Sequence, residues 1–196
     1  MTIPIEDLIR VRIIALLEEP EMNSPVVILH DPDSNRVLPI WIGAAEARAI
    51  AMGLQDVEIS RPLTHTLISN MVDELDGIIQ HVVIERIDAG TYYAMIALVD
   101  KDGKLHEIDA RPSDSIALAL ELEIPIFITS EVLNAAGQDN PFPAEVVADK
   151  ENDEKLRQAF LANAPKAKSD FSDNELLDLK ILLEKARKRE ETTGGE

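Results

Sequence analysis

The chain has 196 residues, which is enough for one domain with a sizeable core and an appended segment. It contains no cysteine, which excludes disulfides, thiolate metal sites and thiol nucleophiles. No stretch approaches the roughly 20 apolar residues of a membrane span, and the first residues lack a signal-peptide pattern, so the sequence predicts a soluble cytoplasmic protein.

The acidic charge falls mostly on the part that is predicted to fold. The net charge is −18, and residues 1–138 carry 23 acidic and 9 basic residues. A generic nucleic-acid binder has the opposite sign, because neutralising phosphates drives such binding. Any nucleic-acid role therefore requires a locally basic spot or bound cations.

Apolar alternation predicts three strands followed by a helix in the first part of the chain. The strands are expected at 9–17, 26–30 and 36–42, with the turn-forming residues DPDSN between the last two. Gly43 precedes an alanine-rich segment that predicts a helix ending near Gly53.

A second group of elements follows in a similar order. Thr64 is the expected N-cap of a helix that stops at Gly77, and strands are predicted at 78–87, 92–100 and 104–109, joined by the turns DAG and DKDG. Pro112 begins the next predicted helix, which runs to about 123. A strand at 126–129 and a helix at 131–136 complete the domain.

The order of these elements suggests an internal duplication. Both halves read strand, strand, strand, helix, and neither could bury its apolar face alone. We therefore predict an α+β fold, a two-layer domain built from a duplicated β-β-β-α unit, with a helical C-terminal extension.

The chain is expected to divide into three parts. The domain covers 1–138, a linker with a short charged helix covers 139–171, and a C-terminal helix with a disordered end covers 172–196. Ser172 and Glu175 form a capping box before an aliphatic stripe. That stripe and Trp41, which is predicted on a largely apolar face, indicate a homodimer or higher homo-oligomer.

Two of the predicted helices have an acidic residue in the first turn, and these residues allow two interpretations. Glu46 and Asp114 either stabilise the helix dipole or converge on one cleft and hold a divalent cation. Asp109 and Arg111 are either a surface ion pair or functional, since a guanidinium orients phosphate well. His65 is a candidate base, and Arg61 is a second candidate phosphate contact.

Several motifs together resemble the bifunctional nuclease family, also called the domain of unknown function 151 family. They are SPVVILHD, RVLPIWIGAAEARAIA, RPLTHTL, TYYAMIAL, and DARPSDSIALAL with PIFI, over about residues 9–137. The resemblance implies DNase and RNase activity, and the positions that match are Glu46, Arg61, His65, Asp109, Arg111 and Asp114. The family motifs usually have an acid where this chain has Thr66 and an alanine where it has Ser115.

These observations lead to two hypotheses about function. The first hypothesis is a nuclease acting on DNA and RNA, with Mg²⁺ or Mn²⁺ held by Glu46, Asp109 and Asp114. His65, Asp109 and Asp114 would be catalytic, and Arg61 and Arg111 would bind phosphate. The alternative is a non-catalytic homo-oligomeric or small-anion-binding module, which the acidic charge favours.

Overall fold

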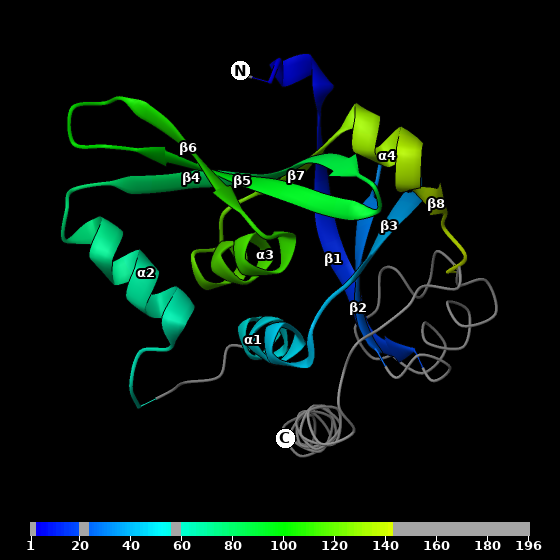
Figure 1. Ribbon diagram of the computed structural model, residues 1–196, viewed down its shortest axis with the longest axis horizontal. Coiled ribbons are helices and arrows are strands. Elements are labelled where there is room, and N and C mark those ends of the chain that lie inside the picture. Colours follow the sequence, from blue (N-terminus) through cyan, green and yellow to red (C-terminus); the bar gives the residue numbers. More distant parts are fainter. Residues whose placement is uncertain (1–2, 20–23, 56–59, 143–196) are drawn as a thin grey trace, which may run out of the picture.

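The computed structural model describes residues 3–19, 24–55 and 60–142. The predicted C-terminal helix and nearly all of the predicted linker lie outside these residues. Among the described residues, no helix is long and apolar enough to cross a membrane. The fold class is the predicted mixture of strands and helices, shown in Figure 1.

Within these described ranges, eight strands form one sheet in the order β6-β5-β4-β7-β1-β2-β3-β8. All neighbouring pairs are antiparallel except β4 and β7, which are parallel. The strands are β1 (Leu8–Glu19), β2 (Ser24–Asp31), β3 (Arg36–Trp41), β4 (Ile78–Asp88), β5 (Thr91–Val99), β6 (Leu105–Ala110), β7 (Ile126–Thr129) and β8 (Gln138–Asp139).

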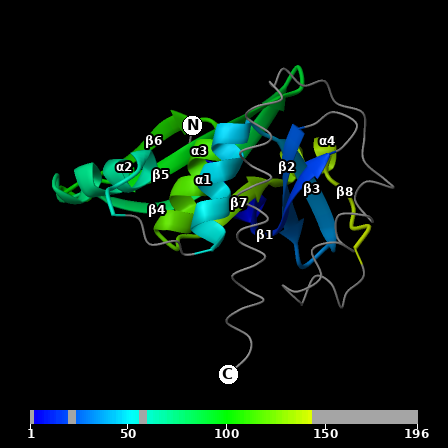
Figure 2. The ribbon, with the colours of Figure 1, turned by 90° about the horizontal axis from the view of Figure 1, so that it is seen from below.

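The helices lie mainly on one side of the sheet. Figure 2 shows α3 between α1 and α2, and α1 and α3 pack directly against each other. The helices are the short 3-10 turn η1 (Ile5–Asp7), α1 (Ala44–Leu54), α2 (Thr64–Asp73), α3 (Pro112–Glu121) and α4 (Ser130–Ala136). The main aliphatic core lies between the sheet and the pair formed by α1 and α3, where Ile50 and Ile116 are fully buried.

A close approach of α1 and α3 depends on a glycine. A Cβ atom on Gly53 would lie 2.9 Å from the Cβ atom of Leu120, which is closer than side chains pack. Near the other end of α1, Ala47 is completely buried in the same core. Small residues therefore let the two helices run side by side, and this contact aligns their first turns.

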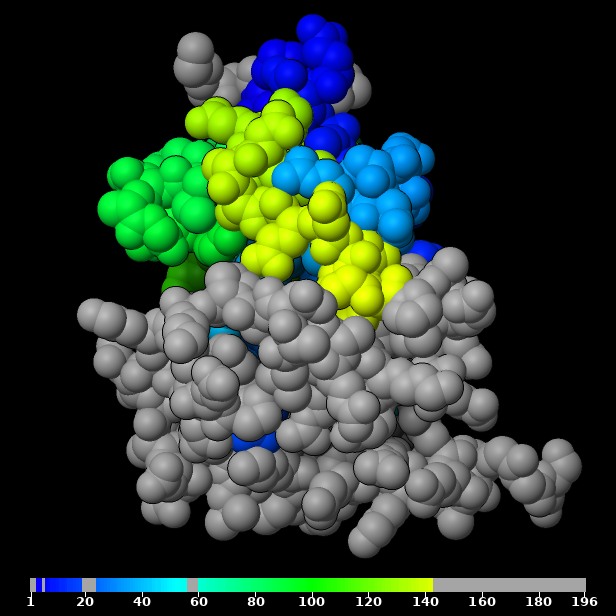
Figure 3. Space-filling view, turned by 90° about the vertical axis from the view of Figure 1, so that its right-hand side faces the viewer, coloured from blue at the N-terminus to red at the C-terminus, as the bar shows by residue number. Residues whose placement is uncertain are grey.

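The last helix in the described part of the chain contacts both halves of the sheet. α4 contacts β3 from one half and both β4 and β7 from the other. Its N-cap is Thr129, whose side chain accepts a hydrogen bond from the backbone N–H of Val132. Figure 3 shows the yellow-green surface of α4 between the green middle of the chain and the light-blue N-terminal third. The guanidinium of Arg36 also donates to the carbonyl oxygen of Gly137 at 2.8 Å.

The predicted boundary at residue 138 falls inside this fold. Asp139 pairs with Arg36 in the sheet, and Phe142 is buried against the N-terminal strands beside Trp41, which is itself partly buried there. The folded domain therefore continues at least to Phe142. The expected β-β-β-α order occurs twice, but element order alone does not establish a duplication, which stays a prediction.

Candidate functional site

The N-termini of three helices meet at one place on the domain surface. The N-cap residues are Gly43 for α1, Leu63 for α2 and Arg111 for α3, and none of these helices has a side-chain hydrogen bond that caps its first turn. Thr64 was expected as the N-cap of α2, but it is the first helical residue. Three helix starts without side-chain caps present free backbone N–H groups and the positive ends of three helix dipoles.

Arg111 connects two of these helix starts. Its Nε and Nη2 atoms donate to both carboxylate oxygens of Asp114, at 2.7 and 3.1 Å, and its Nη1 atom donates to Oε1 of Glu46 at 2.7 Å. Glu46 lies in the first turn of α1 and Asp114 in the first turn of α3. One guanidinium therefore bridges two carboxylates that are 68 positions apart in the chain.

His65 joins this group from α2. Its Nε2 atom lies 3.7 Å from Oδ1 of Asp114, within ion-pair range if the ring is protonated and slightly too far for a hydrogen bond. The His65 side chain is 18% exposed, whereas Arg111 is 65% exposed. We call Glu46, His65, Arg111 and Asp114 the Arg111 cluster.

The local sequence explains why Arg111 sits at this junction. β6 ends at Ala110, and Arg111 takes an extended conformation with φ −73° and ψ 146° before the helix begins. Pro112 is the first helical residue, where its fixed φ favours helix initiation and its missing N–H costs nothing. Arg111 is thus held between a strand and a helix, and its side chain reaches both α3 and α1.

The electrostatics of the cluster favour a permanently charged guanidinium. Hydrogen bonds to Asp114 and then to Glu46 raise the pKa of Arg111 further above its usual value. With His65 neutral, the cluster carries two negative charges and one positive charge. The helix dipoles add partial positive charge at the same place, which partly offsets this net negative charge.

Two of the predicted site residues make no recorded contact with the Arg111 cluster. Asp109 is paired with Met95 across the sheet, and directly opposite residues in an antiparallel pair share a face. Met95 packs with Val83 and Ala97 in a separate apolar cluster, on the face turned away from α1 and α3. Arg61 is exposed just before α2, and the structure records no hydrogen bond or ion pair between it and other described residues.

The structure does not bring Glu46, Asp109 and Asp114 together as one set of metal ligands. Among the described residues, no group of three or more His, Asp or Glu side chains is arranged to hold a metal ion. Glu46 and Asp114 do lie together, but both carboxylates are bound to Arg111. The predicted roles of these residues stay predictions.

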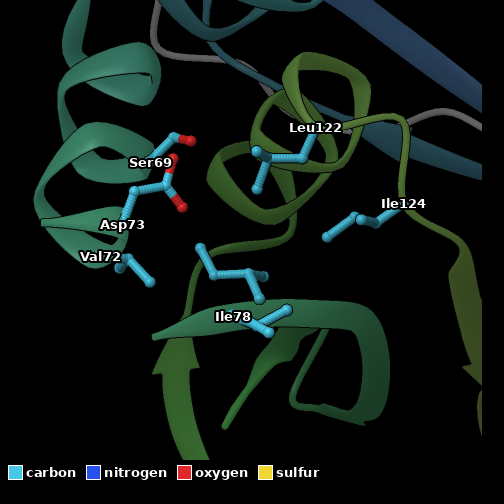
Figure 4. Close-up of a pocket in the computed structure, with 7 residues that line it drawn as sticks. Ser69, Val72, Asp73, Ile78, Leu122 and Ile124 are labelled. Atoms are coloured by element: carbon cyan, nitrogen blue, oxygen red, sulfur yellow. The ribbon is translucent and has the colours of Figure 1, made fainter. Parts of the chain in front are cut away.

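A shallow hollow of about 140 Å³ lies at the other end of α2, away from the Arg111 cluster. Figure 4 shows it between α2, the start of β4 and the segment after α3. Its lining is mainly aliphatic and comprises Ser69, Val72, Asp73, Ile78, Ile79, Leu122 and Ile124. The Arg111 cluster and this mainly aliphatic hollow are therefore in different places.

Comparison with known proteins gives one family. A family model described as the bifunctional nuclease domain matches residues 27–141. An uncharacterized protein of Mycobacterium tuberculosis (strain ATCC 25618 / H37Rv) is 42% identical over 127 residues, which is 65% of this chain and 75% of that protein. Bifunctional nuclease 1 of Oryza sativa subsp. japonica is 21% identical over 133 residues, or 66% of this chain and 40% of that protein.

A second plant relative extends this likeness. Bifunctional nuclease 1 of Arabidopsis thaliana is 26% identical over 117 residues, which is 58% of this chain and 36% of that protein. The chain thus spans less than half the length of these plant relatives. The matched region contains the complete Arg111 cluster and most of the sheet. This chain belongs to the bifunctional nuclease domain family.

Proposed function

We propose that this protein is a nuclease that hydrolyses phosphodiester bonds of DNA and RNA at the Arg111 cluster. The observation that carries the proposal is the convergence of an exposed guanidinium, a half-buried imidazole and three helix N-termini at one place. Membership in the family and the names of the plant relatives support the same reaction class.

Arg111 is the proposed phosphate contact. A guanidinium has five N–H donors, and hydrogen bonds to Asp114 and Glu46 use three of them. The remaining donors are available to a phosphate oxygen, and the side chain is 65% exposed. Backbone N–H groups at helix starts bind phosphate in the same manner, and Arg61 is close enough in sequence to α2 to add a second cation.

His65 is the proposed proton-transfer group. An imidazole can accept and donate protons near neutral pH, and Asp114 lies 3.7 Å away on the same side. Asp114 would hold the ring in orientation while it also fixes Arg111. Two parts of the site, the proton-transfer group His65 and the phosphate contact Arg111, would therefore both depend on Asp114.

For a bound Mg²⁺ or Mn²⁺ ion, only the carboxylates of Glu46 and Asp114 lie together as candidate ligands. Carboxylate oxygens are the ligands that such ions take, but a third carboxylate from Asp109 lies on the other face of the sheet. The three-ligand set that the sequence predicted therefore does not fit one ion in this arrangement. Comparing cleavage in added Mg²⁺, in added Mn²⁺ and in chelator tests the metal proposal directly.

The alternative is a module that binds a small anion without chemistry. Two observations support it. The net charge of −18 opposes tight binding of long nucleic acids, and two carboxylates already occupy several hydrogen-bond donors of Arg111.

A protein free of cysteine also suits a reducing compartment, so we propose a cytoplasmic location for either function.

Asp114→Asn is expected to lower cleavage of single-stranded DNA and RNA by about 10²-fold or more, because the change removes the group that orients both His65 and Arg111. Initial rates should be measured under each metal condition. Asp33→Asn is the matched control, because it removes the same charge from an exposed turn far from the cluster.

The outcomes of this comparison are distinct. Cleavage that persists unchanged in Asp114→Asn would mean that the activity comes from another site or from a contaminant. Absence of cleavage by the wild type in every metal condition, together with saturable binding of inorganic phosphate, would favour the anion-binding module.

A separate variant tests where Asp109 belongs. Because the register directs its side chain to the face away from the Arg111 cluster, we expect Asp109→Asn to cleave at close to the wild-type rate. The measurement is the same initial-rate assay at saturating metal. A loss as large as that of Asp114→Asn would place Asp109 in the working site, on the same face as the Arg111 cluster.

A further inference from the structure

An arginine and a tyrosine form a stacked pair on two neighbouring strands of the sheet. Arg86 of β4 is paired with Tyr93 of β5, and its guanidinium carbon lies over the Tyr93 ring, 3.4 Å from the ring centre. The Arg86 side chain is 46% exposed, so the pair lies at the surface. We call these two residues the Arg86–Tyr93 stack.

The Arg86–Tyr93 stack lies on the face of the sheet opposite α1 and α3. Tyr92 and Ala94 pack in the core that the sheet forms with these helices. Tyr93 stands between them in the strand, so its side chain points to the other face, where Met95 packs. Figure 1 shows α1, α2 and α3 on one side of β4, β5 and β6, and η1 on the other.

A β-bulge directs Arg86 to this face. Val83 lies on the same face as the stack, and an uninterrupted strand would place Arg86 on the helix side together with Ile84. The register shifts between Ile84 and Arg86, where Glu85 is the extra residue. The hydroxyl of Thr129 in β7 donates to the carbonyl oxygen of Glu85 at 2.9 Å and holds the bulge in place. Bulges that re-aim a side chain are frequent beside active sites.

The stack begins next to the Arg111 cluster, around the end of an edge strand. The last pair between β5 and β6 is Ala94 with Ala110, so Tyr93 and Arg111 each lie one residue beyond it. Arg111 keeps an extended backbone, and neighbouring strands are about 5 Å apart. β6 is the outermost strand on this side of the sheet that the structure describes. A bound chain can therefore pass from one face to the other around the end of β6.

Among the aromatic side chains in the described part of the chain, Tyr93 is the one suited to hold a ligand beside the Arg111 cluster. Tyr92 packs against the core on the helix side. Trp41 and Phe142 pack in the apolar cluster of the N-terminal strands, and Phe127 packs with the apolar residues of β4 and β5. Tyr93 instead has a guanidinium over its ring.

We propose that the Arg86–Tyr93 stack binds an unpaired nucleobase of the nucleic-acid strand whose phosphate is bound at Arg111. Aromatic rings and guanidinium planes hold single-stranded nucleic acids by stacking on their bases. With Tyr93 on one side, the guanidinium of Arg86 offers its other side to a base. This inference rests on the proposed nuclease function, because the same strand has to reach Arg111.

The charge around the stack favours a base over a second phosphate. A carboxylate oxygen of Glu85 lies 3.6 Å from Nε of Arg86, and Asp109 is on the same face of the sheet. These carboxylates repel phosphate but not an uncharged base. In a duplex the bases are stacked on each other and both strands carry phosphates, so the proposed subsite selects single strands.

Fluorescence anisotropy of labelled oligonucleotides with the full chain tests the proposal as binding rather than as cleavage. The probes are a single strand of about 12 nucleotides, the same sequence as a duplex, and a strand of the same length in which the bases are absent. Chelator is present throughout, and electrophoresis verifies that the probes stay intact. We expect the wild type to bind the single strand about tenfold or more tightly than either other probe.

Variants at the stack separate its ring from its charge. Tyr93→Leu should weaken binding of the single strand by about 5- to 100-fold and binding of the base-free strand by less than about twofold, because only the ring is lost. Tyr93→Phe keeps the ring and should bind within about twofold of the wild type. Arg86→Lys keeps the charge but loses the plane, so it should also weaken binding of the single strand selectively.

Two controls complete the series. Phe127→Leu removes a ring from the same face on β7 and should leave both affinities unchanged. Arg111→Lys acts on phosphate and should weaken the single strand and the base-free strand alike. Far-ultraviolet circular dichroism verifies that each variant is folded.

The possible results separate this inference from the nuclease proposal. A Tyr93→Leu variant that binds the single strand as tightly as the wild type would overturn the inference, and so would equal wild-type affinity for the three probes. Either result, in a protein that cleaves, would leave the nuclease proposal standing. Ring-dependent binding by a protein that cleaves in no metal would retain the base subsite and remove the nuclease function.

Discussion

Replacing His65 by glutamine is expected to lower the rate of phosphodiester cleavage by about 10²–10⁴, the usual contribution of a positioned proton-transfer group. Glutamine keeps similar size and hydrogen-bonding capacity but cannot exchange a proton in this range. His65 does not cap α2 and is only partly buried, so the fold should tolerate the change. The measurement is the cleavage rate between about pH 5 and 8, where imidazole changes its protonation.

His106→Gln is the matched control for this experiment. His106 also lies beside an aspartate, with its Nε2 atom 2.7 Å from Oδ2 of Asp100, but the pair belongs to the turn between β5 and β6. The pH dependence of the wild-type rate should be retained in His106→Gln and flattened in His65→Gln. A His65→Gln variant with the wild-type rate and pH profile would remove the imidazole from the mechanism.

Much of the fold follows from local patterns in the sequence. Alternating apolar residues and the turn DPDSN predicted β2 and β3, and DAG and DKDG mark the hairpins that join β4, β5 and β6. Pro112 and the aliphatic run after it predicted α3. These signals act within a few residues, so they can be read without knowing which strands become neighbours.

The grouping of side chains could be predicted only where a helix start fixed their position. Glu46 and Asp114 were expected to converge because each is in the first turn of a helix, and the structure brings both to Arg111. Asp109 and Arg111, which were expected as a pair, would share a face only if the two-residue period of a strand continued through both. That period ends at Ala110, and the face on which Asp109 lies is set by the packing of the whole sheet.

The orientation of α2 shows the same limit. A stripe at helical spacing identifies an amphipathic helix, but the sequence does not state which side faces the domain. Here His65 meets Asp114, Ser69 and Val72 line the hollow beside the segment after α3, and Met71 and Leu75 are exposed. Contacts between distant segments decided this, and no signal inside 64–73 encodes them.

Substitution of Arg111 by lysine is expected to reduce cleavage by about 10- to 100-fold while leaving stability almost unchanged. An ammonium cannot bridge Asp114 and Glu46 and still present donors to phosphate, so at least one charge-assisted hydrogen bond is lost. Such a bond contributes about 1.5–3 kcal/mol, which corresponds to this change in rate. Because the side chain is 65% exposed, its ion pairs should contribute only about 0.2–1 kcal/mol to folding.

Arg36→Lys provides the opposite pattern. Arg36 donates to the carbonyl oxygen of Gly137 and to Asn134 in the contact between β3 and α4, so its loss should lower the melting temperature and leave cleavage intact. Glu46→Gln combined with Arg111→Lys should cost less than the sum of the two single changes, since both act on one contact. If Arg111→Lys instead destabilised the protein and cleaved normally, the Arg111 cluster would be a structural clamp between α1 and α3 rather than the place where phosphate binds.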